Sequence, residues 1–241
     1  MNRQTAMFDA PEVTPSTFVS WNDFLWEDFD WKQGEHVTIC APTGWGKTTL
    51  GLGLLPKREH VAILATKPWD STLEGLRSEG YRIIDSWPPM PVPSQRRVIY
   101  WPDVRDPKNL AKQRDAMKEV LLDIYRCGGW TVFLDELDYF CNYLKLAPLV
   151  ELLWRQGRAL NVSVVGGTQR PAFVPLLAYD QATHLFVGRD NDDVNLRRYS
   201  SMSGGGKPYQ QSVRAAITGL DRHEFLYLNS RREGFVGTKV A

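Results

Sequence analysis

The sequence has few cysteines, and they do not build a metal site or a disulfide framework. Cys40, Cys127 and Cys141 are the only three, and neither a Cys-x-x-Cys pair nor a matching histidine cluster accompanies them. A disulfide-rich secreted domain and a structural zinc site are therefore both unsupported. Three separate thiols fit the reducing interior of a cell, which is where we expect the protein.

Long apolar runs are also missing. No stretch approaches the ~20 apolar residues that cross a bilayer, and the first residues lack the charged and apolar parts of a secretory signal. We therefore expect a soluble, cytoplasmic protein without a membrane segment.

The chain has no large excess of either charge. Its 29 lysines and arginines face 28 acids, for a formal net charge of +1. No global basic field indicates nucleic acid, so any DNA contact would be local or would come from a ring of subunits that focuses a few charges. The charge is uneven, because residues 1–30 are acidic whereas lysine and arginine gather in residues 189–241.

Short apolar, β-branched runs alternate with helical patterns, which is typical of a parallel sheet with crossover helices. The predicted strands are 36–40, 60–66, 81–85, 97–101, 130–135, 161–167 and 183–188, with a possible terminal hairpin of 225–230 and 234–240. The clearest predicted helices are 47–55, 70–79, 107–126, 137–158 and 191–201. A chain of 241 residues suffices for one well-packed α/β domain.

A phosphate-binding loop follows the first of these strands. Its sequence is Ala41-Pro-Thr-Gly-Trp-Gly-Lys-Thr48, and it leads into the helix predicted at 47–55. In the strand–GxxxxGK[ST]–helix motif, backbone N–H groups wrap the phosphates, the lysine reaches the β and γ oxygens, and the hydroxyl helps to hold Mg²⁺. Lys47 and Thr48 take these two roles, which predicts ATP as the nucleotide and Mg²⁺ as its metal.

The predicted nucleotide contacts are Ala41, Pro42, Thr43, Gly44, Trp45, Gly46, Lys47, Thr48 and Thr49. Gly44 and Gly46 let the backbone approach an anion closely, and the helix dipole points at the same place. Ala41 replaces the first glycine of the motif. Because alanine is also small, we interpret the loop as a variant. A glycine-rich turn that happens to precede a lysine is the alternative, and the flanking strand and helix argue against it.

Two acids end the buried run Trp130-Thr-Val-Phe-Leu-Asp-Glu136. A carboxylate at the end of a strand beside a phosphate loop can hold Mg²⁺, and the next acid can polarise an attacking water. Asp135 is thus the predicted metal-side carboxylate and Glu136 the general base. Acids can also mark a helix N-terminus without chemistry, which fits Asp138 better than Asp135. A water-polarising acid favours a hydrolase over a metabolite kinase.

A third polar site follows another buried strand. The segment Arg155-Gln-Gly-Arg158-Ala-Leu-Asn-Val-Ser-Val-Val-Gly-Gly-Thr-Gln-Arg-Pro171 reads as a helix end with arginines, then a strand, then Thr168 and Gln169. If this strand lies beside the phosphate-loop strand, Gln169 lies near the γ-phosphate. A glutamine there can hydrogen-bond the phosphate or the water and sense hydrolysis.

This segment, with Ala41–Thr48 and Leu134–Glu136, resembles the FtsK/HerA superfamily of ring-forming DNA translocases, and in element order the resemblance covers most of residues 34–230. It implies an α/β fold of the RecA-like P-loop type, in the additional-strand, catalytic-glutamate class, with a mostly parallel central sheet and flanking helices. It also implies a trans-acting arginine finger that completes a neighbour's ATP site. Arg158 is the first candidate and Arg155 the second; a solvated helix-end cation is the alternative for Arg155.

The small size resembles the viral genome-packaging branch of this superfamily. We therefore expect residues 1–33 to be an N-terminal extension with an aromatic flap, and 34–241 to be the ATPase domain with a C-terminal strand pair. The expected partners are other copies of the chain in a hexameric or pentameric ring, double-stranded DNA, and a portal or capsid-vertex protein. A viral protein of this kind would be found in the host cytoplasm or the virion.

DNA contacts are less visible in the sequence. The candidates are Arg189, Arg197, Arg198, Arg231, Arg232 and the segment Ser203-Gly-Gly-Gly-Lys207, which reads as a pore loop or as a surface connection. Lys67-Pro-Trp-Asp70 reads either as a loop toward a pore or as a helix start capped by Asp70.

Two other functions stay open. A superfamily-2 helicase shares the AxxGxGKT loop and the Asp135-Glu-Leu-Asp138 pattern, but such enzymes need a second RecA-like domain for which the chain is too short. A nucleotide-gated assembly or signalling module would bind ATP and hydrolyse little of it.

Overall fold

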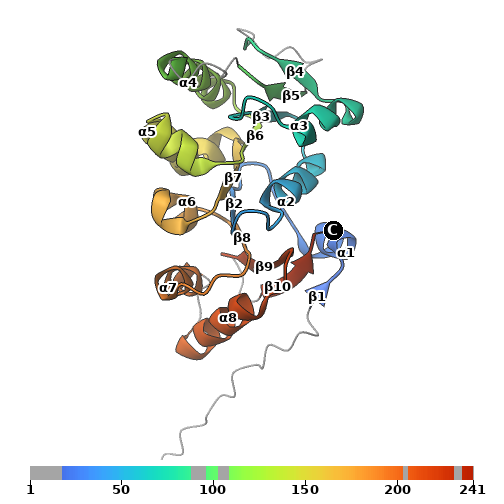
Figure 1. Ribbon diagram of the computed structural model, residues 1–241, viewed down its shortest axis with the longest axis vertical. Helices are drawn as coiled ribbons and strands as arrows, with labels where there is room; N and C mark the ends of the chain where they lie inside the picture. Colours follow the sequence, from blue (N-terminus) through green and yellow to red (C-terminus); the bar gives the residue numbers. More distant parts are fainter. Residues whose placement is uncertain (1–17, 88–95, 103–108, 203–205, 231–234, 241) are drawn as a thin grey trace, which may run out of the picture.

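The computed structural model describes residues 18–87, 96–102, 109–202, 206–230 and 235–240. These residues form one ten-stranded sheet with helices packed on both faces, as Figure 1 shows. The α/β architecture expected from the alternating pattern is confirmed. Within these residues no helix combines the length and the apolar character needed to span a bilayer.

The strands are β1 (Phe18–Val19), β2 (Val37–Cys40), β3 (Val61–Leu64), β4 (Arg82–Ile84), β5 (Arg97–Tyr100), β6 (Thr131–Leu134), β7 (Ser163–Thr168), β8 (His184–Val187), β9 (Glu224–Asn229) and β10 (Phe235–Lys239). Their order is β1-β10-β9-β8-β2-β7-β6-β3-β5-β4. All neighbours are parallel except β9, which is antiparallel to both β8 and β10. The predicted terminal strand pair is therefore confirmed, and β7 does lie beside the phosphate-loop strand β2.

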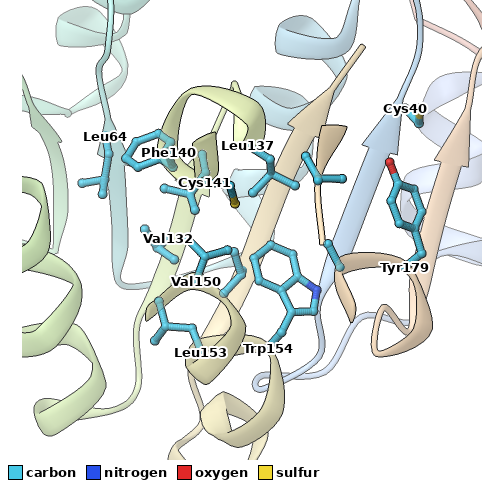
Figure 2. Close-up of a cluster of buried hydrophobic side chains, with 14 of the residues drawn as sticks. Cys40, Leu64, Val132, Leu137, Phe140, Cys141, Val150, Leu153, Trp154 and Tyr179 are labelled. Atoms are coloured by element: carbon cyan, nitrogen blue, oxygen red, sulfur yellow. The ribbon is translucent and has the colours of Figure 1, made fainter. Parts of the chain in front are cut away.

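The α-helices are α1 (Trp21–Asp23), α2 (Lys47–Leu54), α3 (Ser71–Gly75), α4 (Leu110–Cys127), α5 (Ala147–Gln156), α6 (Leu177–Asp180), α7 (Asp193–Met202) and α8 (Lys207–Gly219). In Figure 1, α4, α5 and α6 cover one face of the sheet, and α2 and α3 cover the other. Each face has its own hydrophobic core. Figure 2 shows part of the first, where Val150, Leu153 and Trp154 of α5 gather near Val132 of β6.

One helix prediction was wrong in detail, and one helix was missed. The stretch 137–158 is not one helix, because Lys145 has a left-handed φ of 58° and separates a π-helical turn at Tyr139–Tyr143 from α5. The helix α8 was missed. Its positions Val213 and Ile217 and its C-cap Leu220 are buried and recur at helical spacing, but the glycines before Lys207 favour a loop in the sequence.

The N-terminal segment closes one end of the second core. β1 pairs with β10, and Phe24, Phe29 and Trp31 are buried. The Phe24 ring lies 5.7 Å from that of Phe186 in β8, in an edge-to-face arrangement. These aromatic side chains thus pack against the sheet. The proposed domain boundary at residue 33 stays a prediction.

Candidate active site

The phosphate loop lies at the carboxyl edge of the sheet, between β2 and α2. Gly44 and Gly46 both have left-handed backbones, with φ of 72° and 100°, and Gly46 is the N-cap of α2. L-residues rarely adopt such angles, so glycine at these positions sets the turn of the loop. The N-terminus of α2 and its positive dipole end therefore open onto the loop, as an anion site requires.

The methyl group of Ala41, which replaces the first glycine of the motif, has room because the residue directly after β8 is a glycine. Ala41 is buried, and a Cβ added to Gly188, which follows β8, would stand 2.6 Å from the Ala41 Cβ and 2.7 Å from Cδ1 of Trp45. The indole N–H of Trp45 donates to the Glu224 carbonyl at 2.8 Å. Nδ1 of His223 lies 3.0 Å from the Trp45 carbonyl oxygen. Trp45 therefore ties the loop to the start of β9, while the side chain of residue 41 packs in the space above Gly188.

We expect Gly188→Ala to reduce both stability and nucleotide binding. The added methyl group would overlap Ala41 and Trp45, and overpacking of this kind typically costs about 1–3 kcal/mol. Such a loss should lower the melting temperature by several degrees and weaken binding of a non-hydrolysable ATP analogue, measured by thermal melts and calorimetry. Gly75→Ala in α3 is the matched control, since nothing lies within 4 Å of its added Cβ. A Gly188→Ala protein that melts and binds like the wild type would contradict the packing argument.

Lys47 and Thr48 begin α2 and face the acids of β6. The Lys47 Nζ donates to the carbonyl oxygens of Ala41 and Pro42 at 2.8 and 3.0 Å. Burial lowers the pKa of Lys47, and the nearby charge of Asp135 opposes that shift. The Thr48 hydroxyl lies 2.8 and 2.9 Å from the two Asp135 carboxylate oxygens. Burial raises the pKa of Asp135, against the effects of the Thr48 hydrogen bond and the charge of Lys67.

A cavity of about 150 Å³ joins these groups to the remaining predicted site residues. It is lined by Lys47, Asp135, Glu136, Asp138, Thr168, Gln169 and Arg170. Glu136 follows β6 and Gln169 follows β7, and these neighbouring parallel strands end at the same edge. A larger cavity of about 570 Å³ shares Gln169 and Arg170 and extends over Ala41, Pro42 and Thr43. The structure thus brings together the lysine, the two acids and the glutamine that the sequence singled out separately.

The residues present fit a Mg²⁺–nucleotide complex. Thr48 and Asp135 place a hydroxyl and a carboxylate in contact beside the phosphate loop. Within the described part of the chain there is no group of three or more His, Cys, Asp or Glu residues that could hold a metal. Mg²⁺ commonly takes only one or two protein oxygens and completes its shell with phosphate and water, so this sparse donor set suits it.

The two predicted finger arginines lie at the opposite edge of the sheet. Arg155 lies in the last turn of α5, and Arg158 lies in the 3-10 turn Gly157–Leu160 that precedes β7. Both are exposed, and the Arg155 guanidinium forms an ion pair with Glu151 at 3.9 Å. Since a strand rises about 3.3 Å per residue, the six residues of β7 separate this turn from Gln169 by about 20 Å. Neither arginine lies at the phosphate loop of its own chain.

Other candidates from the sequence are placed as follows. Arg189 is exposed and lines the larger cavity. Arg197 and Arg198 lie on α7, and the Arg198 guanidinium lies 6.0 Å from the ring centre of Tyr179. Lys207 begins α8, whereas residues 203–205 and 231–232 of the proposed pore loop and arginine pair lie outside the described residues.

Sequence reasoning missed several contributors to the site. Trp45 was predicted only as a nucleotide contact and Gly188 was not singled out, although an aromatic residue inside a phosphate loop is a visible signal of packing. The packing around Cys40 was also missed. Cys40 is buried, and its Sγ lies 2.8 Å from the Tyr199 hydroxyl. Figure 2 shows the Tyr179 hydroxyl directed toward Cys40 as well. Burial raises the pKa of the Cys40 thiol to about 12, so this cysteine is a neutral packing residue beneath the loop.

Comparison with solved structures identifies the fold. The genome packaging NTPase B204 from Sulfolobus turreted icosahedral virus 2 matches with a TM-score of 0.63 and 16% identity, over 88% of this chain and 98% of that one. The fold is that of the P-loop packaging and secretion ATPases. VirB4 of Thermoanaerobacter pseudethanolicus matches with a TM-score of 0.60 and 10% identity, over 86% and 89% of the two chains. The cytoplasmic domain of the Thermomonospora curvata type VII secretion ATPase EccC gives 0.56 and 16%, over 87% and 26%.

No protein-family model and no curated protein matches the chain. The P-loop ATPase fold expected from the sequence is nevertheless confirmed by these structures. In this ATPase fold, β2 carries the phosphate loop, β6 the two acids and β7 the glutamine.

Proposed function

We propose that the chain is the ATPase subunit of a ring-shaped motor that moves double-stranded DNA. Packaging of a viral genome is the preferred setting, and transfer of mobile-element DNA is the second. The carrying observation is the split arrangement of the site: Lys47, Asp135, Glu136 and Gln169 line one cavity, while Arg155 and Arg158 lie at the far edge. The likeness to a structure described as a DNA-packaging ATPase supports this setting.

The cavity residues and Thr48 would each have a separate role in ATP hydrolysis. Lys47 would bind the β and γ phosphate oxygens, and Thr48 and Asp135 would hold Mg²⁺, which neutralises charge that develops on the phosphates. Glu136 orients a water and accepts its proton. Gln169 hydrogen-bonds the γ-phosphate or that water, so its contacts change when the phosphate leaves. Lys47, Asp135, Glu136 and Gln169 line the cavity, and the Thr48 hydroxyl lies 2.8 Å from Asp135 Oδ1.

The position of Arg155 and Arg158, away from the phosphate loop of their own chain, supports a ring. An arginine that stabilises the transition state must contact the γ-phosphate, and neither Arg155 nor Arg158 is near the phosphate loop of its own chain. A head-to-tail contact that repeats around a closed ring would bring this edge of one subunit to the cavity of the next. The site of each subunit is then complete only in the assembly.

DNA dependence of the ATPase rate tests this function. We expect linear duplex DNA to raise the rate and the specific activity to rise with protein concentration, because subunits must assemble to pair arginine with site. Salt should weaken the DNA effect, since phosphate contacts release counterions. The Lys47→Ala protein is the control for contaminating ATPases. A rate that responds neither to DNA nor to protein concentration would contradict the motor and favour a nucleotide-gated assembly module.

A further inference from the structure

A lysine with no assigned role contacts both acids of the site. Lys67 follows β3, the neighbour of β6, so its loop meets the end of β6 at the carboxyl edge. Its Nζ lies 3.7 Å from Asp135 Oδ2, 4.0 Å from Glu136 Oε1 and 3.6 Å from Asp70 Oδ2. One flexible cation therefore serves the predicted metal ligand and the predicted general base together.

Hydrogen bonds fix the backbone of the loop at Lys67 and at Asp70. The Trp101 indole N–H donates to the Lys67 carbonyl at 2.7 Å. Asp70 caps α3 by accepting from the Thr72 and Leu73 amides, as the helix-start interpretation expected. Both sets of hydrogen bonds hold the backbone. The Lys67 side chain is 46% exposed, so it has room to change rotamer and move away from the acids. Its neighbour Trp69 is 65% exposed.

Lys67 and a bound Mg²⁺ ion would both be attracted to the carboxylate of Asp135. A Mg²⁺ ion bound by Thr48 and Asp135 would stand within a few ångströms of the ammonium group, and like charges at such distances repel. In the arrangement seen here, the ammonium group lies 3.7 Å from Asp135 and 4.0 Å from Glu136, so its charge offsets that of both carboxylates. The doubly charged ion attracts Asp135 more strongly than a single ammonium does.

We propose that Lys67 is the resting counter-ion of Asp135 and Glu136, and that Mg²⁺ arriving with the nucleotide expels it and frees Glu136 to act as the base. Lys67 is thus a positioning residue that keeps the general base occupied until the metal is in place. This inference rests on the proposed function in one respect, the assignment of Thr48 and Asp135 as metal ligands.

The test is the affinity of the full-length protein for Mg²⁺ alone, measured by calorimetry or by competition with Mn²⁺. Lys67→Met should bind the metal about three- to tenfold more tightly than the wild type, because a partly exposed ion pair to each acid is removed. Lys67→Arg keeps the charge and should stay at the wild-type affinity or below it. Lys118→Met, an exposed lysine of α4, is the matched control for charge loss and should leave the affinity unchanged.

The outcomes separate this inference from the proposed function. If Asp135→Asn binds Mg²⁺ as well as the wild type does, the metal is held elsewhere and the proposed site fails. If Asp135→Asn loses the metal but Lys67→Met binds it no more tightly, or more weakly, Lys67 does not compete with Mg²⁺ and the inference is overturned. Thermal melts of the Lys67 variants should match the wild type, since the side chain is half exposed and lies outside both cores.

Discussion

Replacing Glu136 with glutamine should lower the ATP turnover number by about 10²–10⁴-fold, the usual contribution of a positioned acid or base. Glutamine has the same shape as glutamate but cannot accept a proton from water. The amide should leave ATP binding nearly unchanged, because Lys47, Thr48 and the loop backbone supply the phosphate contacts. Steady-state ATPase rates and calorimetry with a non-hydrolysable analogue would measure the two quantities.

A matched variant separates the general base from a loss of surface charge. Glu119→Gln removes one exposed carboxylate from α4 and should hydrolyse ATP at the wild-type rate. If Glu136→Gln also hydrolyses ATP normally, Glu136 is not the base. If it loses ATP binding together with turnover, the carboxylate acts on the nucleotide or its metal, which would move the base assignment to another acid of the cavity, Asp138.

Mixing two inactive proteins should restore part of the ATPase activity. Arg158→Ala should lose about 10³–10⁵-fold in rate, by comparison with arginine fingers in GTPases. In a mixture with Glu136→Gln protein, a subunit that keeps Glu136 can receive Arg158 from a neighbour that keeps the arginine. Random assembly of equal amounts in a closed ring would make about one quarter of the interfaces competent in this way.

The readout is the ATPase rate of the mixture against the sum of its two components. An arginine that works only within its own chain gives no recovery, and that result would contradict the shared site. Arg155→Ala, tested in the same mixture, decides between the two candidate arginines. Arg126→Ala is the control, since Arg126 is exposed at the end of α4 on the same edge of the sheet and should not affect the rate.

Much of the sheet could be predicted because its central strands are buried on both faces. β2, β3, β6 and β8 are short apolar runs with every residue buried, which marks a parallel strand covered by helices. The polar residues at their ends then stand out. Asp135 and Gln169 stand out in this way after β6 and β7, and Lys47 stands out through the loop motif that follows β2.

The rest depends on contacts between segments that are far apart in the sequence. That Ala41 requires Gly188, or that Trp45 reaches Glu224, follows only from the order of the strands. Lys67 was noticed as part of a loop, but its proximity to Asp135 needs β3 beside β6. The amphipathic helix α8 was missed since three glycines before it suggested a loop. The helix break at Lys145 depends on a left-handed backbone that the residue type does not favour.

The strand β7 follows the arginine turn and ends at Thr168, directly before Gln169, and it runs through the middle of the sheet, hydrogen-bonded to β2 and β6 on its two sides. Packed protein interiors have low compressibility and transmit strain, so a displacement at one end of this strand is passed toward the other. If Arg155 or Arg158 serves the neighbouring site as proposed, a shift of Gln169 when phosphate departs would displace that arginine in a closed ring. Release of phosphate from one subunit would then promote hydrolysis in the next. The order in which the subunits hydrolyse ATP around the ring would follow from the direction in which this strand runs.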